Sequence, residues 1–377
     1  MRSIRAPASA APPPGTPAST EPSRRPRRAL GFLLLGATIA GLIVLSPLIG
    51  PVGISPAVVG SILLHQATGG AFPPDACGGA VGSAARCAIL VEIVWDIRLP
   101  ALLLALLVGA GLGLSGATLQ GLFRNPLADP YLLGLSSGAS LGAATLFVLG
   151  IGAQAANLTL PLFAFFGAMI TGGIVLLAAR SPRSTPTTLL LTGVALSSFL
   201  SAILGTLLLF NPLGNLQVSY WLLGGLFGAT WDRVAIVFGG LLIGGALLAA
   251  HGRELNLLQL GSEVAQSLGV DARRVRVRLL LLASFVTAVA VAFTGIIGFV
   301  GLISPHVVRR LFSSDYRVVL GGSVLVGAVF LALAQDVSQL IPFGTEIPVG
   351  IPTSFAGFPF FLYLLYRRRA RPLEATG

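Results

Sequence analysis

The sequence contains no lysine: all 24 of its strongly basic side chains are arginines. A Walker A loop needs a lysine on the nucleotide phosphates and a Schiff-base enzyme needs an amine, so the chain carries neither activity itself. The 3 histidines lie far apart, and no HExxH motif, cysteine pair at metal spacing or carboxylate cluster occurs. We therefore predict no catalytic residues, no metal and no cofactor bound by this chain.

Charge is also scarce: 10% of the residues are charged and 54% are hydrophobic, with a mean hydropathy of +0.89. This composition indicates an all-α integral membrane protein. Crossing about 30 Å of hydrocarbon takes about 20 helical residues, and about ten apolar runs are long enough. The predicted spans are residues 30–50, 99–122, 131–150, 159–179, 187–210, 234–250, 278–295, 297–312, 317–341 and 348–366, all within one membrane domain, residues 29–369.

The arginines are distributed asymmetrically along these spans. All but Arg86, Arg98 and Arg233 fall on one side, which the positive-inside rule makes cytoplasmic together with both termini. The net charge of +11 is thus explained by topology, and we predict no nucleic-acid partner. Termini on one side require an even number of crossings. Ten spans meet this requirement. The spans 278–295 and 297–312 are counted as two because of this parity, since almost no polar loop separates them at residues 294–299.

The predicted ends and outer loop differ in composition from the spans. Residues 1–28 are rich in proline, alanine, serine and arginine and predict a disordered cytoplasmic tail; residues 370–377 form a second tail. The outer loop, residues 50–97, holds both cysteines, Cys77 and Cys87. Their short spacing in an oxidising compartment predicts a disulfide, with two free thiols as the alternative.

The centres of the predicted spans contain no Asp, Glu or His. Ion-coupled carriers usually place such a residue near midspan, so this absence argues against one. An ion-coupled transporter and a membrane-embedded enzyme remain the alternative functions. Small residues recur at four-residue spacing, as in Gly109 and Gly113, and predict closely packed helices.

The longest cytoplasmic loop, residues 252–277, predicts two short helices joined at Gly261. Leu255, Leu258, Val264 and Leu268 would form one apolar side. Ser262 would cap the second helix, and Gly269 would end it. From the pattern alone, this side could enter the groove of a cytoplasmic partner or lie on lipid.

A second cytoplasmic segment, "LFRNPLADP" at residues 122–130, predicts a tight turn between two spans. Pro126 and Pro130 would end and restart the helices, and Asp129 would cap the second one. Arg124 would keep the turn on the cytoplasmic side. Turn chemistry alone also accounts for Asn125 and Asp129.

Several separated motifs resemble one family. They include "IRLP" at residues 97–100, "GATLQGLFRNPLADPYLLGLSSGASLG" at 116–142, "LGSEVAQSLGV" at 260–270, "GIIGFVGLISPHVVRR" at 295–310 and "EIPVGIPTSFAGFPFFLYLL" at 346–365. Together they resemble the FecCD/BtuC-like permease subunits of ATP-binding cassette (ABC) type II importers for vitamin B12, heme and ferric siderophores.

The resemblance implies ten helices per subunit and two identical subunits around a translocation path in a bacterial cytoplasmic membrane. It also implies two separate ATPase subunits, which bind ATP and Mg, and an outer substrate-binding protein. The chain itself would be no enzyme. Its cargo would be an iron chelate, heme first, a ferric siderophore next and vitamin B12 third.

The resemblance also assigns roles to residues. The ATPase-coupling residues would be Leu260, Gly261, Ser262, Glu263, Ala265, Leu268 and Gly269. A cytoplasmic group beside the gate would comprise Arg124, Asn125, Pro126, Asp129, Pro305, His306 and Arg309, with a helix-end hydrogen bond rather than a metal at His306. The gate would be Thr185, Pro186 and Thr187, where Pro186 departs from the family's usual hydroxyl residue. Arg86 and Arg98 would dock the binding protein.

Overall fold

The computed structural model describes residues 25–70, 83–148, 156–181, 185–210, 212–340 and 346–369, and these are helical apart from turns and short connections. The elements of the first part are α1 (Arg25–Leu45), η1 (Ser46–Leu48), α2 (Pro56–Ala67), α3 (Ser83–Val91), the π-helical η3 (Glu92–Arg98), α4 (Leu99–Phe123), η4 (Pro130–Leu133), α5 (Leu135–Val148) and α6 (Ala156–Ala179). The rest are α7 (Pro186–Phe210), α8 (Pro212–Leu222), α9 (Trp231–Ala250), α10 (Gly252–Gln259), α11 (Ser262–Ser267), α12 (Ala272–Thr294), α13 (Val300–Leu311), α14 (Tyr316–Leu340) and α15 (Gly350–Arg369).

Each of the ten predicted spans contains a helix, which confirms the all-α membrane fold. Within the described residues, 7 helical segments are long and apolar enough to cross a membrane, and α5 and α15 provide shorter apolar helices. The predicted span at 297–312 is only partly helical: α13 has 12 residues, about 18 Å at 1.5 Å per residue. Gly295, at a φ of 70°, ends α12, and the chain stays non-helical until α13 begins.

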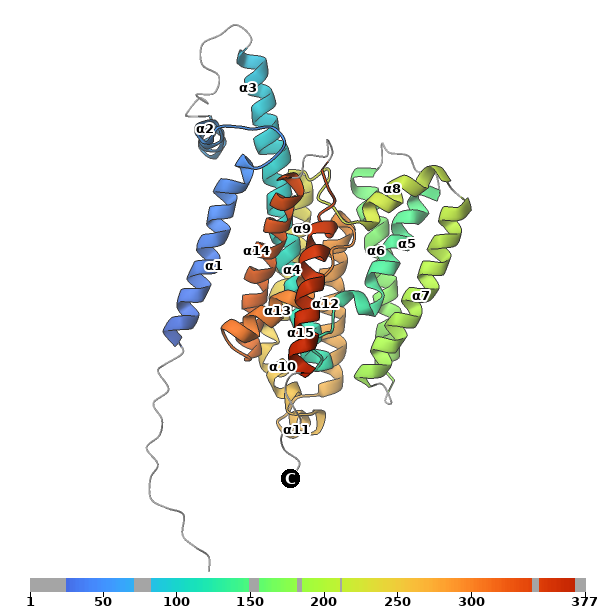
Figure 1. The fold of residues 1–377 in the computed structure, drawn as a ribbon. Helices are drawn as coiled ribbons and strands as arrows, with labels where there is room; N and C mark the ends of the chain where they lie inside the picture. Colours follow the sequence, from blue (N-terminus) through green and yellow to red (C-terminus); the bar gives the residue numbers. More distant parts are fainter. Residues whose placement is uncertain are drawn as a thin grey trace, which may run out of the picture.

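The central helix is α4, which packs against α9, α12, α13 and α14. Figure 1 shows α5 to α8 as a group on one flank and α1 on the other. Glycines let the backbones touch: a Cβ on Gly109 would lie 2.2 Å from the carbonyl oxygen of Gly327, and one on Gly116 would lie 2.0 Å from that of Gly301. The prediction of close packing at small residues is confirmed for Gly109 and Gly113, which both face α14.

The two ends of the bundle differ. The start of α1, the helices α10 and α11 and the end of α15 lie at the lower end in Figure 1, whereas α2 and α3 lie at the upper end. The predicted outer loop 50–97 is therefore largely helical where it is described. The continuous helical segment Arg86–Phe123, 38 residues long, carries α3 through η3 into α4. Of the predicted tail 1–28, residues 1–24 lie outside the described residues, as does the tail 370–377, whereas residues 25–28 belong to α1 and are helical, so that part of the prediction is wrong.

Candidate coupling and translocation site

The helices α10 and α11 form the lower tip of the molecule, and their inner side is apolar. Leu255 and Ala265 are 0% exposed and Leu258 is 4% exposed, because α10 packs on α4 and α14 and α11 packs on α12. Gly261, at a φ of 121°, separates the two helices, and Gly269, at a φ of 82°, follows the second. Both glycine predictions are confirmed.

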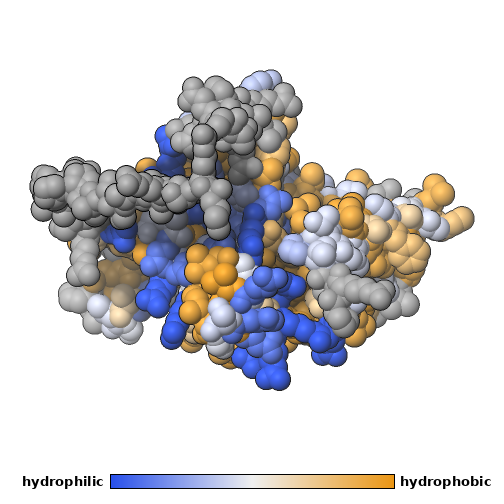
Figure 2. Space-filling model, turned by 90° about the horizontal axis from the view of Figure 1, so that it is seen from below, coloured by the Kyte–Doolittle hydropathy of each residue, from blue (hydrophilic) through white to orange (hydrophobic). Residues whose placement is uncertain are grey.

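Three large apolar side chains point outward from this tip. Leu260, Val264 and Leu268 are 62%, 44% and 55% exposed, respectively, and the exposed Glu263 lies among them in sequence. Leu260 follows α10, Val264 lies in α11 and Leu268 follows α11, so the turn at Gly261, and not the periodicity of one helix, leaves all three exposed. We call these three residues the outer apolar face. Figure 2 shows this end from below, with hydrophilic side chains gathered over its middle around a hydrophobic cluster.

Two predictions about this segment are wrong. Leu255 and Leu258 point inward while Val264 and Leu268 point outward, so the four do not share one apolar side. The turn at Gly261 reorients the second helix relative to the first, which a single helical pattern cannot show. Ser262 is the first residue of α11 and not its cap: the N-cap is Gly261, which makes no side-chain cap hydrogen bond.

Polar side chains of α10 fasten the tip to the bundle. The Gln259 Nε2 donates to the carbonyl oxygen of Gly121 in α4 at 2.7 Å. The Asn256 Nδ2 donates to Asp315 Oδ1 at 2.7 Å, and Asn256 Oδ1 accepts from the Tyr316 backbone N–H at 2.9 Å. Sequence reasoning missed Asn256 and Gln259. Their polarity next to the inward-facing leucines was the available signal.

The turn between α4 and α5 has the predicted form. Arg124 ends α4 in the left-handed region at a φ of 49°. The Asn125 Oδ1 accepts from the Leu127 backbone N–H at 3.0 Å. Asp129 Oδ1 accepts from the backbone N–H of Tyr131 at 2.9 Å and so caps η4. Burial raises the pKa of Asp129 to about 6, although the Tyr131 N–H bond acts in the opposite direction.

Pro126, between Asn125 and Leu127, is partly buried in this turn. Beyond the cap, the Tyr131 hydroxyl donates to the carbonyl oxygen of Ile297 at 2.8 Å and accepts from the Ile297 N–H at 3.0 Å. The turn is thus attached to the non-helical segment that precedes α13.

Helix α13 is joined to α4 through Arg309. Its Nη2 donates to the Gln120 Oε1, and Gln120 Nε2 donates to the carbonyl oxygens of Gly301 and Leu302 at 3.3 Å. Gln120, which sequence reasoning missed, thus connects the end of α4 to both ends of α13. A glutamine within an apolar run was the signal.

Pro305 and His306 lie within α13. Pro305 is buried, and the His306 ring stands edge-on to Phe360 of α15, with ring centroids 5.6 Å apart. His306 therefore lies beside α15 rather than in the turn with Asn125 and Asp129. Among the described residues, no group of three or more His, Cys, Asp or Glu side chains could hold a metal ion.

The predicted gate residues begin α7. Thr185 Oγ1 accepts from the Thr188 backbone N–H at 3.1 Å and lies 2.9 Å from the Thr188 hydroxyl, so Thr185 caps the helix. Pro186 is its first residue, a position that suits proline because no helical N–H partner is lost there. Thr185 and Thr187 are exposed. The gating role itself stays a prediction.

The two arginines predicted to dock a binding protein occupy different environments. Arg98 is 5% exposed and donates to the carbonyl oxygens of Pro47 at 2.8 Å and Val52 at 2.6 Å. Gly50 leaves room for this guanidinium, since a Cβ there would lie 2.6 Å from it. Arg98 holds the segment after α1 in place, which does not fit a surface docking role. Arg86 is exposed on α3, so Arg86 alone remains predicted to dock the binding protein.

Cys87 is buried in α3 and disulfide-bonded. Cys77 lies outside the described residues, so its pairing with Cys87 stays a prediction. At the same end of the molecule, the Ser46 hydroxyl donates to Asp336 Oδ2 at 2.8 Å and joins the end of α1 to α14.

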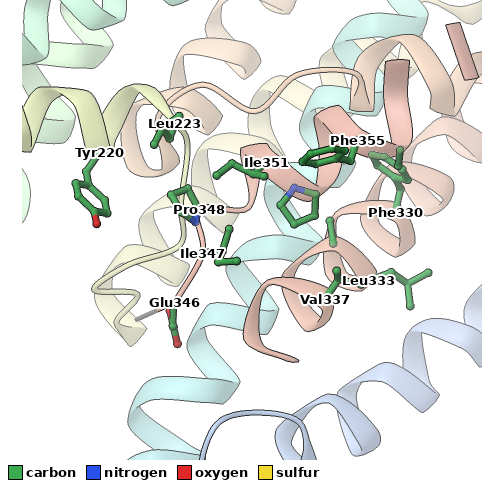
Figure 3. A pocket seen from close by; sticks show the side chains of 13 residues that line it. Tyr220, Leu223, Phe330, Leu333, Val337, Glu346, Ile347, Pro348, Ile351 and Phe355 are labelled. Carbon is green, nitrogen blue, oxygen red and sulfur yellow. The ribbon is translucent and has the colours of Figure 1, made fainter. Parts of the chain in front are cut away.

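A large apolar cavity of about 1010 Å³ lies between α8, α14 and the start of α15. Figure 3 shows its lining, with the polar side chains of Tyr220 and Glu346 on one side of the group, away from Phe330 and Phe355. The remaining lining residues are aliphatic, proline or alanine. Sequence reasoning missed this cavity because its walls combine α8 with α14 and α15, which come much later in the chain.

Known proteins resemble the chain over most of its length. A model of the FecCD transport family matches residues 33–367. The "Cobalamin import system permease protein BtuC" of Halobacterium salinarum is 46% identical over 286 residues, 74% of this chain and 75% of that protein. The "Hemin transport system permease protein HmuU" of Yersinia pestis is 39% identical over 280 residues, 73% of this chain and 84% of that protein.

The fold is also shared with a solved structure. A metal-chelate type ABC transporter in an inward-facing conformation superposes with a TM-score of 0.75 and 28% sequence identity, covering 90% of this chain and 99% of the solved one. Relatives with other named cargoes exist, among them the "Fe(3+)-citrate import system permease protein YfmD" of Bacillus subtilis, 38% identical over 278 residues, 74% of this chain and 82% of that protein.

Proposed function

Because the chain belongs to the FecCD transport family of ABC-importer permeases, we propose that it carries a metal chelate inward. The first candidate is an iron chelate, with heme ahead of a ferric siderophore, and vitamin B12 is the third. The chain is a multi-pass membrane transport component and not an enzyme. Relatives are named for cobalamin, hemin and Fe(3+)-citrate. These names support the class of bulky chelate.

The outer apolar face carries the proposal. Leu260, Val264 and Leu268 are three large apolar side chains that are exposed close together in sequence. Grouped exposed apolar side chains outside a membrane usually mark a surface that binds a partner. The three residues belong to the motif that resembles the coupling helices of the family. We infer that this face, with Glu263, enters a groove of a separate ATPase subunit that binds ATP and Mg.

The proposed mechanism is alternating access. ATP binding would draw two ATPase subunits together, and α10 and α11 would pass that motion to α4 and α14 through Gln259 and Asn256. The permease supplies shape rather than chemistry. Weak apolar contacts of the kind that line the 1010 Å³ cavity would let a large chelate enter and leave.

A second copy of the chain would complete the path. Phe355 lines the cavity and is 78% exposed, so one copy alone leaves this wall open. We place the tip, and with it both termini, in the cytoplasm of a bacterial cell, because most arginines fall on that side of the predicted spans. A substrate-binding protein would dock at the opposite end, where Arg86 is exposed.

The test is reconstituted uptake. The chain, its ATPase subunits and a binding protein would be placed in lipid vesicles and offered heme, a ferric siderophore and vitamin B12. We expect ATP-dependent uptake of one chelate, and none with the permease alone. Uptake on a sodium or proton gradient without ATP would favour the ion-coupled transporter, and chemical change of a solute by the isolated chain would favour the membrane enzyme.

A further inference from the structure

A polar pocket of about 570 Å³ lies where α1 begins and α13 ends. It is separate from the outer apolar face and from the apolar cavity. One of its lining residues, Phe312, packs against Phe32 of α1, with ring centroids 5.5 Å apart. Its lining residues are Arg28, Arg309, Arg310, Leu311, Phe312, Ser313, Ser314 and Asp315.

Positive charge exceeds negative charge in this pocket: three arginines face one carboxylate. The carboxylate is already occupied, because Asp315 Oδ1 accepts from Asn256 Nδ2 at 2.7 Å and from the Arg317 backbone N–H at 2.9 Å, where it caps α14. The Asn256 hydrogen bond and the Arg317 N–H bond lower the pKa of Asp315. Asp315 therefore stays ionised at neutral pH and interacts with Arg28 and Arg317, but this single carboxylate cannot neutralise all three arginines of the lining.

Two guanidinium nitrogens in the pocket lack an acceptor. Within the part of the chain that the structure describes, Arg28 Nε and Arg309 Nη1 are buried and have no hydrogen-bond partner. The other terminal nitrogen of Arg309 already donates to Gln120, and the Arg309 guanidinium also interacts with the Tyr316 hydroxyl. Buried charged donors without acceptors are costly. The pocket therefore requires an acceptor with several oxygens, and the planar fork of arginine matches a phosphate.

The depth of the pocket indicates where that phosphate comes from. Arg28 is the first residue of the apolar span Arg28–Leu48, and Arg309 and Arg310 are in the last turn of α13. Both positions correspond to the boundary between hydrocarbon and water, where lipid headgroups lie. The C-terminal dipole of α13 is unfavourable to an anion, so the arginine side chains must provide the binding.

We propose that this pocket binds the phosphate of an anionic membrane lipid, held by Arg28, Arg309 and Arg310. A lipid bound there would link the start of α1 to the turn between α13 and α14. No covalent step is involved. The pocket lies at the same end of the bundle as α10 and α11 (Figure 1), so the lipid would sit beside the moving tip.

The test measures lipid retention by the full chain in detergent, using native mass spectrometry with phosphatidylglycerol against phosphatidylcholine of equal chain length. The variants are Arg28→Gln and Arg310→Gln, which leave the Arg309 contact with Gln120 intact. Arg278→Gln is the matched control, since Arg278 is an exposed arginine of α12 outside the pocket. Unchanged thermal unfolding of each variant shows that it is folded.

We expect the wild type to prefer phosphatidylglycerol, and Arg28→Gln and Arg310→Gln each to weaken that binding about tenfold, the loss of one charge-assisted contact. The Arg278→Gln variant should match the wild type. A parallel experiment offers inorganic phosphate instead of lipid. If binding of free phosphate depended on Arg28 and Arg310 while binding of lipid did not, the proposal that the phosphate belongs to a lipid would be overturned. Equal losses in all three variants, or no preference between the lipids, would overturn the site. No ATPase or chelate is present, so the result is independent of the uptake assay.

Discussion

The outer apolar face gives the sharpest test of coupling, through the substitution Leu268→Ala. The change removes three carbon atoms, about 2.4 kcal/mol of burial at about 0.8 kcal/mol per methylene. Leu268 is 55% exposed in the free chain, so contact with an ATPase subunit can add only that part, about 1.3 kcal/mol. We expect the ATPase to bind about tenfold more weakly.

The assay is equilibrium binding of the labelled ATPase subunit to the permease in nanodiscs. Leu177→Ala is the matched control, because Leu177 is 65% exposed but belongs to α6 and not to the outer apolar face. Neither change should shift thermal unfolding by much, since exposed side chains contribute little to stability. A Leu268→Ala affinity within twofold of the wild type, or an equal loss in Leu177→Ala, would refute the assignment of the coupling surface.

Three further predictions concern stability and covalent state. The raised pKa of Asp129, about 6, exceeds that of an aspartate in the unfolded chain, so the folded protein binds this proton more tightly. The contribution of Asp129 to stability should therefore be greatest below pH 4. It should fall as pH rises through 6, by up to about 3 kcal/mol. Asp129→Asn keeps the cap and should remove this dependence in thermal unfolding measured from pH 4 to 7. Gly116→Ala should lower the unfolding temperature, since its Cβ would lie 2.0 Å from a backbone oxygen of α13 and overpacking costs about 1–3 kcal/mol. The control Gly173→Ala, whose Cβ would have nothing within 4 Å, should leave the unfolding temperature unchanged. Equal effects of the two changes would contradict the packing argument. A bond between Cys77 and Cys87 should make the unreduced chain lighter than the reduced chain by two hydrogen atoms in intact-mass measurement, and two free thiols would exclude it.

The long spans could be predicted because length and apolarity are local properties. Helices such as α6 and α14 follow directly from uninterrupted apolar runs. Glycine positions were informative for the same reason: Gly261 and Gly269 end helices through their own backbone conformation. The turn containing Asp129 was predictable because its hydrogen bond reaches only two residues along the chain.

Properties that depend on distant partners could not be predicted. Arg98 lies in a motif from which we predicted an exposed residue at the outer end of a span. Its hydrogen-bond acceptors are instead the carbonyl oxygens of Pro47 and Val52, about fifty residues earlier in the chain. The length of α13 is likewise set by contacts, since the segment before it is held by Tyr131. Leu255 and Val264 look alike in sequence, and only the packing of α10 on α4 distinguishes them.

Alternating access needs the tip to move together with part of the bundle, and the hydrogen bonds of α10 indicate which part. Gln259 is bonded to α4, and Asn256 is bonded to the start of α14. These two helices are also in backbone contact at Gly109 and Gly327, so they cannot slide past each other without losing that contact. A force applied to α11 should therefore displace α4 and α14 as one unit. Helix α7, which begins with the predicted gate residues, has no such bond to α10 among those described; it packs on α5, α6, α8 and η4 and also touches α4. We expect motion of α4 to reach α7 both through their direct contact and through the turn at Asp129 and η4, so loosening that turn should weaken transmission to α7 without loosening the tip.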